Sequence, residues 1–139
     1  MRPRLIRRAR VGLAFLSLMT GIHHIALRVK DCEVSARFYE RAFGLREIRR
    51  LESEGELRAV WIRAGTAVLM LERSLRGTGS PGGSGHVLVF PTQDLAAAER
   101  RLSEEGIAVT DRTAATLYVE DPDGHRSGCS VYGFDDARP

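Results

Sequence analysis

The clearest pattern in the chain is an alternation of apolar and polar residues that leads into a helical pattern. Residues 22–29 alternate, with an aliphatic side and a mixed side, which is typical of a strand with one buried face. Asp31 then fits a helix N-cap and Gly44 fits the C-terminal stop. Between them apolar residues recur at helical spacing: Val34, Phe38, Ala42 and, just beyond the stop, Leu45. The pattern predicts a strand followed by one amphipathic helix.

Three further strand patterns follow this helix. They cover residues 46–53, 56–64 and 66–73. Glu54-Gly55 and Ala64-Gly65 supply the turns between them. The first half of the chain is therefore predicted to be a βαβββ unit.

The second half repeats this order. A strand is predicted at 86–90, Asp94 fits the next N-cap, and Leu95, Ala98 and Leu102 mark the apolar side of a helix that stops at Gly106. Strands are predicted near 107–112, 116–120 and 126–132, with an Asp-Pro-Asp-Gly hairpin turn at residues 121–124. The repeat indicates a duplicated unit and an α+β fold of two βαβββ modules.

Each module has a histidine at the start of its first strand. His24 lies seven residues before Asp31, and His86 lies eight residues before Asp94. A fold with pseudo-twofold symmetry would bring these two imidazoles together. A site shared between the modules is the expected consequence.

Charge is distributed unevenly along the 139 residues. Residues 1–20 hold five of the 21 basic residues and no acidic residue, which leaves 16 basic and 18 acidic residues in the rest. The predicted folded part thus has no basic surplus of the kind that nucleic-acid binding requires. Nucleic-acid binding is not expected.

The first twenty residues differ from the remainder in composition. An Arg-rich start precedes a short apolar run at 11–19, too short to span a bilayer. Three interpretations stay open: an extension without a role in the fold, with Met19 as the true start; a signal or interfacial helix; or an ordered, packed helix. The predicted single domain covers 21–134, with modules at about 21–73 and 85–133 and a tail at 135–139.

The two cysteines and the glycine-rich segment have simple interpretations. Cys32 and Cys129 are far apart in sequence, which suggests free, buried thiols in a reducing compartment, and we expect a cytoplasmic protein. The Gly/Ser/Pro segment at 74–84 precedes a strand rather than a helix, so it is interpreted as a connector and not as a phosphate cradle.

Several segments resemble the vicinal oxygen chelate superfamily of glyoxalase I, bleomycin resistance proteins, fosfomycin resistance thiol transferases and extradiol dioxygenases. The resemblance covers residues 21–134. It rests on His24-Ile25-Ala26-Leu27-Arg28-Val29-Lys30-Asp31, Phe38-Tyr39-Glu40-Arg41-Ala42-Phe43-Gly44-Leu45, Gly85-His86-Val87-Leu88-Val89-Phe90 and Asp121-Pro122-Asp123-Gly124-His125. It implies that the two modules form a U-shaped mixed-sheet cup, and that single-domain members pair as homodimers.

The resemblance also implies a divalent metal at the base of the cup. The ligands carried over are His24 and His86 from the first strands, with Glu72 as carboxylate and as candidate base. The two positions where relatives usually have a carboxylate fall on Met70 and Gly128. Mn, Fe, Ni or Zn would suit imidazole and carboxylate ligands, whereas Met sulfur is a poor substitute.

Parity along the strands predicts the residues that line the cup. On this argument Phe90 shares a side with His86, while Ser130 and Tyr132 share one with Gly128. His125 is expected to be exposed, His23 to be structural, and the turn aspartates to serve the turn. The predicted cup residues are Arg28, Trp61, Met70, Phe90, Tyr118, Ser130 and Tyr132.

Two functions are consistent with these residues. The first is a metal-dependent lyase, isomerase or dioxygenase that acts on a small oxygen-chelating substrate. Its metal would act as a Lewis acid. The second is a metal-free protein of the bleomycin-resistance type that sequesters a small molecule. The retained histidines favour the first function, and the missing carboxylates favour the second.

Overall fold

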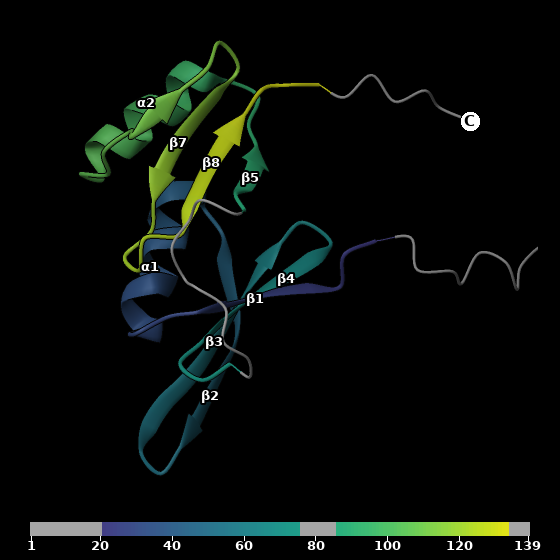
Figure 1. The fold of residues 1–139 in the computed structure, drawn as a ribbon, viewed down its shortest axis with the longest axis vertical. Helices are drawn as coiled ribbons and strands as arrows, with labels where there is room; N and C mark the ends of the chain where they lie inside the picture. The colour runs from purple at the N-terminus through teal and green to yellow at the C-terminus, as the bar shows by residue number, and fades with distance from the viewer. Residues whose placement is uncertain (1–20, 76–85, 134–139) are drawn as a thin grey trace, which may run out of the picture.

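The computed structural model describes residues 21–75 and 86–133 and contains two four-stranded mixed sheets, each with one helix (Figure 1). The elements of the first module are β1 (His24–Arg28), α1 (Cys32–Phe43), β2 (Arg46–Ser53), β3 (Glu56–Ala64) and β4 (Ala67–Glu72). Those of the second are β5 (Leu88–Pro91), α2 (Leu95–Glu104), β6 (Asp111–Arg112), β7 (Thr116–Glu120) and β8 (Arg126–Ser130). The predicted α+β fold of two βαβββ modules is confirmed.

The two sheets have the same topology. Their strand orders are β1-β4-β3-β2 and β5-β8-β7-β6, and in each the first strand pairs in parallel with the fourth. The main departure from the predicted elements lies in the second module, where the strand expected at 107–112 is reduced to Asp111–Arg112. Among the described residues, no helix is long and apolar enough to cross a membrane.

Both helices start where the sequence predicts and α1 also stops there, whereas α2 ends at Glu104 with Glu105 as its C-cap, one residue before the predicted stop at Gly106. The Asp31 side chain accepts a hydrogen bond from the Val34 N–H, and Asp94 does the same for Ala97. Gly44 ends α1 in the left-handed conformation, at a φ of 69° that favours glycine. These residues fix where the two helices begin and where α1 ends.

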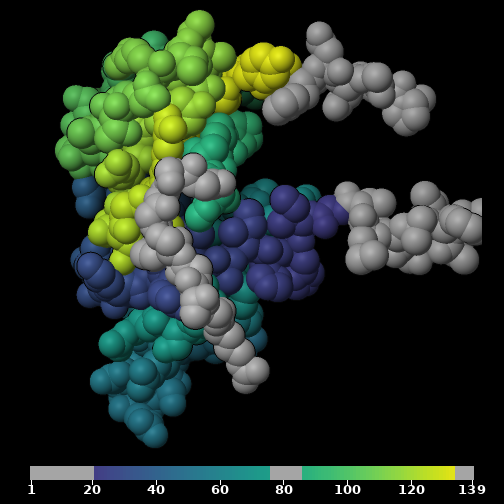
Figure 2. All heavy atoms as spheres, viewed as in Figure 1, coloured from purple at the N-terminus to yellow at the C-terminus, as the bar shows by residue number. Residues whose placement is uncertain are grey.

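Helix α1 joins the modules into one core. Leu27 and Leu71 of the first sheet belong to the same buried cluster as Leu117 and Val119 of the second, and Tyr39 of α1 is fully buried within it. Figure 2 shows the second module, green to yellow, directly against the first, purple to teal. The hairpin of β2 and β3 extends away from the second module (Figure 1).

The turn between β7 and β8 also holds the modules together. Asp121 accepts a hydrogen bond from the Tyr39 hydroxyl at 2.8 Å, and Asp123 accepts one from the Ser35 hydroxyl at 3.1 Å. Asp123 also accepts the Lys30 backbone N–H at 2.9 Å. The aspartates thus shape the turn, as predicted, and also anchor it to the start of α1.

Candidate functional site

We call the side of each sheet that is turned away from its helix the open face. On the first sheet, strand register places twelve residues of the open face in three rows that cross the strands from β1 to β2. The first row holds His24, Val68, Arg63 and Arg46; the second Ala26, Met70, Trp61 and Arg49; the third Arg28, Glu72, Ala59 and Leu51. The alternation predicted for residues 22–29 is therefore present, with Leu27 and Val29 in the core.

The two predicted metal ligands of the first module lie in different rows. His24 is opposite Val68, whereas Glu72 is opposite Arg28, four residues further along the strand. That separation corresponds to about 13 Å of strand. The nearest polar partner of His24 is the neighbouring His23, with their Nδ1 atoms 2.9 Å apart. Glu72 is therefore not placed to share an ion with His24 in this sheet.

On the second sheet, Gly128 takes the position that Met70 takes on the first. Val89, Gly128 and Tyr118 form one row, which matches Ala26, Met70 and Trp61. Neither Met70 nor Gly128 is a carboxylate. The register thus makes these two positions correspond to each other, and their correspondence to the usual carboxylates of the family stays a prediction.

The register leaves no room for a side chain at Gly128. A Cβ atom built there would lie 2.3 Å from the backbone oxygen of Leu117 and 3.2 Å from Cδ1 of Tyr118. The Tyr118 ring therefore occupies the space in front of this glycine. Gly128 does not simply mark a lost carboxylate, because a carboxylate could not be accommodated without moving the neighbouring strand.

His86 is not the structural counterpart of His24. If Gly128 matches Met70, then Val89 matches Ala26 and Val87 matches His24. Val87 also lies seven residues before Asp94, as His24 does before Asp31. His86 precedes β5, and the nearest ring to it is that of His125, at 6.3 Å between centroids. The second module thus presents an apolar residue where the first presents an imidazole.

Phe90 is a correction to the predicted cup residues. Its ring packs on Phe43 at 4.6 Å and on Tyr39 at 6.4 Å between centroids, which is the helix side of the sheet. The prediction assumed that His86 lies on the open face and that Phe90, four residues later, lies on the same side of the strand. The register instead turns Val89 toward the open face, where it is 41% exposed.

His125 is also a correction, because it is buried rather than exposed. It is 4% exposed, and its Nε2 lies 2.8 Å from the backbone oxygen of Arg28. Its Nδ1 has no hydrogen-bond partner in the described parts of the chain. The side chain therefore belongs to the contact between the modules.

The residues present do not fit a metal ion held within one chain. In residues 21–75 and 86–133, no three His, Cys, Asp or Glu side chains come together as a group that could hold an ion. His24, Glu72 and His86 lie apart for the reasons given above.

The other predicted cup residues lie in different places. Ser130 and Tyr132 line a hollow of about 490 Å³ on the second module, with Val89, Pro91 and Thr116; Phe90 also borders it. Arg28 instead borders a hollow of about 460 Å³ near the start of α1, with Val29, Lys30, Arg73 and Asp123, and its guanidinium donates to the Leu75 carbonyl at 2.7 Å. Trp61 and Tyr118 occupy the central rows of the two sheets.

An arginine guanidinium lies over each of these two aromatic rings. The sequence did not predict these contacts. The Arg49 guanidinium lies 5.1 Å from the centroid of Trp61, and that of Arg126 lies 4.2 Å from the centroid of Tyr118. Arg49 reaches this side of the sheet because a bulge in β2 shifts the register between Glu47 and Arg49, and the sequence carried no signal for the bulge. Simple alternation along the strand does not reveal it.

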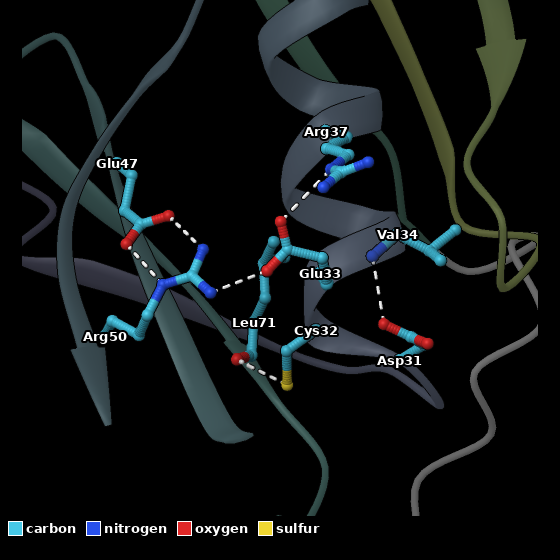
Figure 3. A network of polar contacts seen from close by, with 8 residues as sticks. All are labelled: Asp31, Cys32, Glu33, Val34, Arg37, Glu47, Arg50 and Leu71. Carbon is cyan, nitrogen blue, oxygen red and sulfur yellow. Dashed lines mark hydrogen bonds and ion pairs between the residues drawn. The ribbon is translucent and has the colours of Figure 1, made fainter. Parts of the chain in front are cut away.

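Carboxylates on the helix side of β2 are held by a separate network (Figure 3). Arg50 contacts Glu47 and Glu33 at 2.8 and 2.6 Å, and Glu33 also pairs with Arg37. The hydrogen bonds from Arg50 lower the pKa of both glutamates. Arg50 is thus neutralised by two carboxylates, whereas Arg46 and Arg49 lie on the other side of the same strand.

Comparison with known proteins places these features in a family. The model of the Glyoxalase/Bleomycin resistance protein/Dioxygenase superfamily matches residues 21–127. No curated protein matches the chain by sequence.

Solved structures with the same fold have several activities. Lactoylglutathione lyase from Agrobacterium tumefaciens is 22% identical, with 83% of this chain and 98% of that chain covered and a TM-score of 0.65. TnmS3, an antibiotic binding protein from Streptomyces sp. CB03234, is 20% identical, with 81% and 96% covered and a TM-score of 0.63. A variant of the fosfomycin resistance protein FosX from Listeria monocytogenes, complexed with Mn(II), is 17% identical, with 85% and 94% covered and a TM-score of 0.67. At these identities the likeness concerns the fold.

Proposed function

The chain belongs to the Glyoxalase/Bleomycin resistance protein/Dioxygenase superfamily, and from that premise we propose that it binds a small organic molecule without a metal. The observation that carries the proposal is the pair Met70 and Gly128. They occupy matching central rows of the two sheets, and neither supplies a carboxylate. Leu117 and Tyr118 moreover enclose Gly128, so the neighbouring strand leaves no space for a side chain at this position.

The surroundings of these residues suit an apolar or aromatic ligand. Binding sites for small molecules are mostly apolar, with a few polar groups that set orientation. The hollow beside Ser130 has this composition and a volume of about 490 Å³, which is within the range for such sites. TnmS3, an antibiotic binding protein, supports the same type of function on this fold.

We further propose that the binding form is a cytoplasmic homodimer. β1 and β5 are edge strands in their sheets, and apolar residues next to them are exposed. Ile22 is 63% exposed, Val87 42% and Val89 41%. Exposed apolar edges are usually covered by a partner. Sedimentation velocity should give twice the mass of one chain, while a monomer at micromolar concentration would contradict the dimer.

The first experiment on function measures metal content. Untagged full-length protein, dialysed against a weak chelator, should retain far less than one divalent ion per chain. The chain has one tryptophan, so quenching of Trp61 fluorescence can then be used to screen aromatic and drug-like compounds. Binding by the metal-free protein would support the proposal.

The opposite result has an equally clear meaning. About one Mn, Fe, Ni or Zn per chain, lost in His24→Ala, would overturn the metal-free function. It would favour the metal-dependent lyase or dioxygenase function predicted for His24, Glu72 and His86, assembled between two copies. The matched control is Val68→Ala, which changes the cross-strand neighbour of His24 in the same row and removes no possible ligand.

A further inference from the structure

The open face of the first sheet carries an excess of positive charge. Its three rows contain four arginines, Arg28, Arg46, Arg49 and Arg63, and a single carboxylate, Glu72. Glu72 is in the same row as Arg28, at the far end from Arg46 and Arg63. The positive charge is therefore concentrated on β2 and its neighbour β3.

Two of these arginines are directly opposite each other. Arg46 and Arg63 are cross-strand partners on β2 and β3. Like charges at such positions destabilise a sheet. In the part of the chain that the structure describes, neither makes an ion pair with a carboxylate. An anion between them would remove this repulsion.

Arg50 shows that the same strand can neutralise its charge when it has acidic neighbours. Its guanidinium is held by Glu47 and Glu33 on the helix side (Figure 3). Arg46 and Arg49 lie on the opposite face, where the three rows supply no such neighbour. The difference between the two faces points to an external partner for the open one.

Trp61 adds an aromatic surface to the same region. Its ring lies between Met70 and Arg49 in the middle row, with the Arg49 guanidinium over it. Its Nε1–H is buried without an acceptor among the described residues. A ring beside unpaired arginines is suited to a flat ligand that carries negative charge.

The second module provides an internal comparison. Tyr118 occupies the row position of Trp61, and Arg126 lies over its ring. Here Asp111 pairs with Arg126 at 2.7 Å, and Asp111 is also the cross-strand partner of Tyr118. Arg126 is thus neutralised within the protein. Arg49 takes the row position of Asp111 and pairs with no carboxylate among the described residues.

We propose that Arg46, Arg49, Arg63 and Trp61 form an anion subsite that binds a flat aromatic ligand with an acidic substituent. The acidic group lies between Arg46 and Arg63, and the ring lies against Trp61. The inference rests on the proposed function, because it names the class of molecule that the open face binds. It requires no metal and no covalent step.

The test uses a matched pair of probes, 2-naphthoate and its neutral analogue 2-naphthamide. Full-length protein labelled with ¹⁵N shows one indole N–H signal, that of Trp61, since the sequence has one tryptophan. Naphthoate should shift this signal and bind at least about tenfold more tightly than the amide. The difference should decrease at high ionic strength, because the arginines are exposed.

Two variants test the residues responsible, and two more serve as controls. Arg63→Gln, and independently Arg46→Gln, should bring the affinities for the two probes close together. Arg50→Gln changes the same strand on its helix side and should keep the preference, as should Arg126→Gln in the second module. The anion subsite would be overturned by equal binding of both probes or by the absence of a shift of the Trp61 signal. A preference for naphthoate that survives both Arg63→Gln and Arg46→Gln would also overturn it.

These results are separate from the test of the proposed function. If 2-naphthoate binds the metal-free protein with an affinity that does not depend on Arg46 and Arg63, the subsite is overturned and the binding function stays in place. A stoichiometric metal that survives dialysis would overturn the metal-free function, whatever the preference between the two probes.

Discussion

The hydroxyl of Tyr39 donates a 2.8 Å hydrogen bond to Oδ2 of Asp121, which ties helix α1 of the first module to the closing turn of the second. Both side chains are buried, at 0% and 5% exposure. Burial, together with the nearby Asp121 carboxylate, raises the pKa of Tyr39, so the hydroxyl stays protonated as a donor. This bond is one of the contacts that hold the modules in a fixed relation.

Tyr39→Phe should therefore lower the free energy of unfolding by about 1–3 kcal/mol, because a buried carboxylate loses a donor. Urea denaturation followed by circular dichroism measures this. Tyr118→Phe is the control, since no hydrogen bond to its hydroxyl is found among the described residues. A Tyr39→Phe variant as stable as wild type would show that the contact contributes little to the junction.

The sequence predicted the modules well because the local signals agree with one another. The caps Asp31 and Asp94 and the glycine stop at Gly44 lie where the patterns placed them. Apolar periodicity also identified the helix side of β1 correctly. These features depend on residues that are close in sequence, so they can be predicted from one amino-acid sequence.

The candidate site was less predictable because it depends on strand register. One extra residue before Asp94 moves His86 off the position of His24 and turns Phe90 toward α1. A bulge in β2 places Arg49 over Trp61. The burial of His125 follows from docking between modules, which no local pattern encodes.

Gly128→Ala tests whether the glycine is required by packing. A Cβ atom at this position would meet the Leu117 backbone oxygen at 2.3 Å, so the strands must separate. We expect a loss of about 1–3 kcal/mol in the free energy of unfolding, as for other overpacked sites. Gly133→Ala is the control, because its Cβ would have no neighbour within 4 Å.

The same clash predicts that restoring a carboxylate will not restore a metal site. Gly128→Glu should be destabilised at least as much as Gly128→Ala and should retain no divalent ion after dialysis. Calorimetry and elemental analysis of the same samples check both points. A stable Gly128→Glu protein with bound metal would show that the strands move more easily than the register indicates.

The network around Arg50 predicts a pH dependence of stability. Arg50 lowers the pKa of Glu33 and Glu47 below the ordinary value of 4.5. A carboxylate whose pKa is lower in the folded state stabilises the protein above its unfolded-state pKa, and this stabilisation disappears as the pH falls through the folded-state value. The side chains of both glutamates are more than a third exposed, so the effect should be small and weakened by salt.

Urea midpoints measured at low salt between about pH 6 and pH 3 should decrease in wild type. Arg50→Gln should reduce that decrease, because the two glutamates then titrate near their ordinary values. Arg49→Gln, which removes an arginine from the other face of the same strand, should leave the decrease unchanged. An identical pH profile for wild type and Arg50→Gln would contradict the role assigned to the network.

The two cysteines provide a test of the core. Cys32 and Cys129 are free and buried, at 2% and 5% exposure, and burial raises the pKa of both thiols. The Cys32 thiol also donates to the backbone oxygens of Arg58 and Leu71. Since only the thiolate reacts with a disulfide reagent, both thiols should be labelled slowly in the folded protein and rapidly in denaturant.

The variant Cys129→Ser leaves Cys32 as the only cysteine of the chain. The labelling rate of Cys32 should follow global unfolding, because α1 packs on β3 and β4. Rapid labelling of Cys32 without denaturant would mean that α1 detaches from its sheet, and the modules would then not share one stable core.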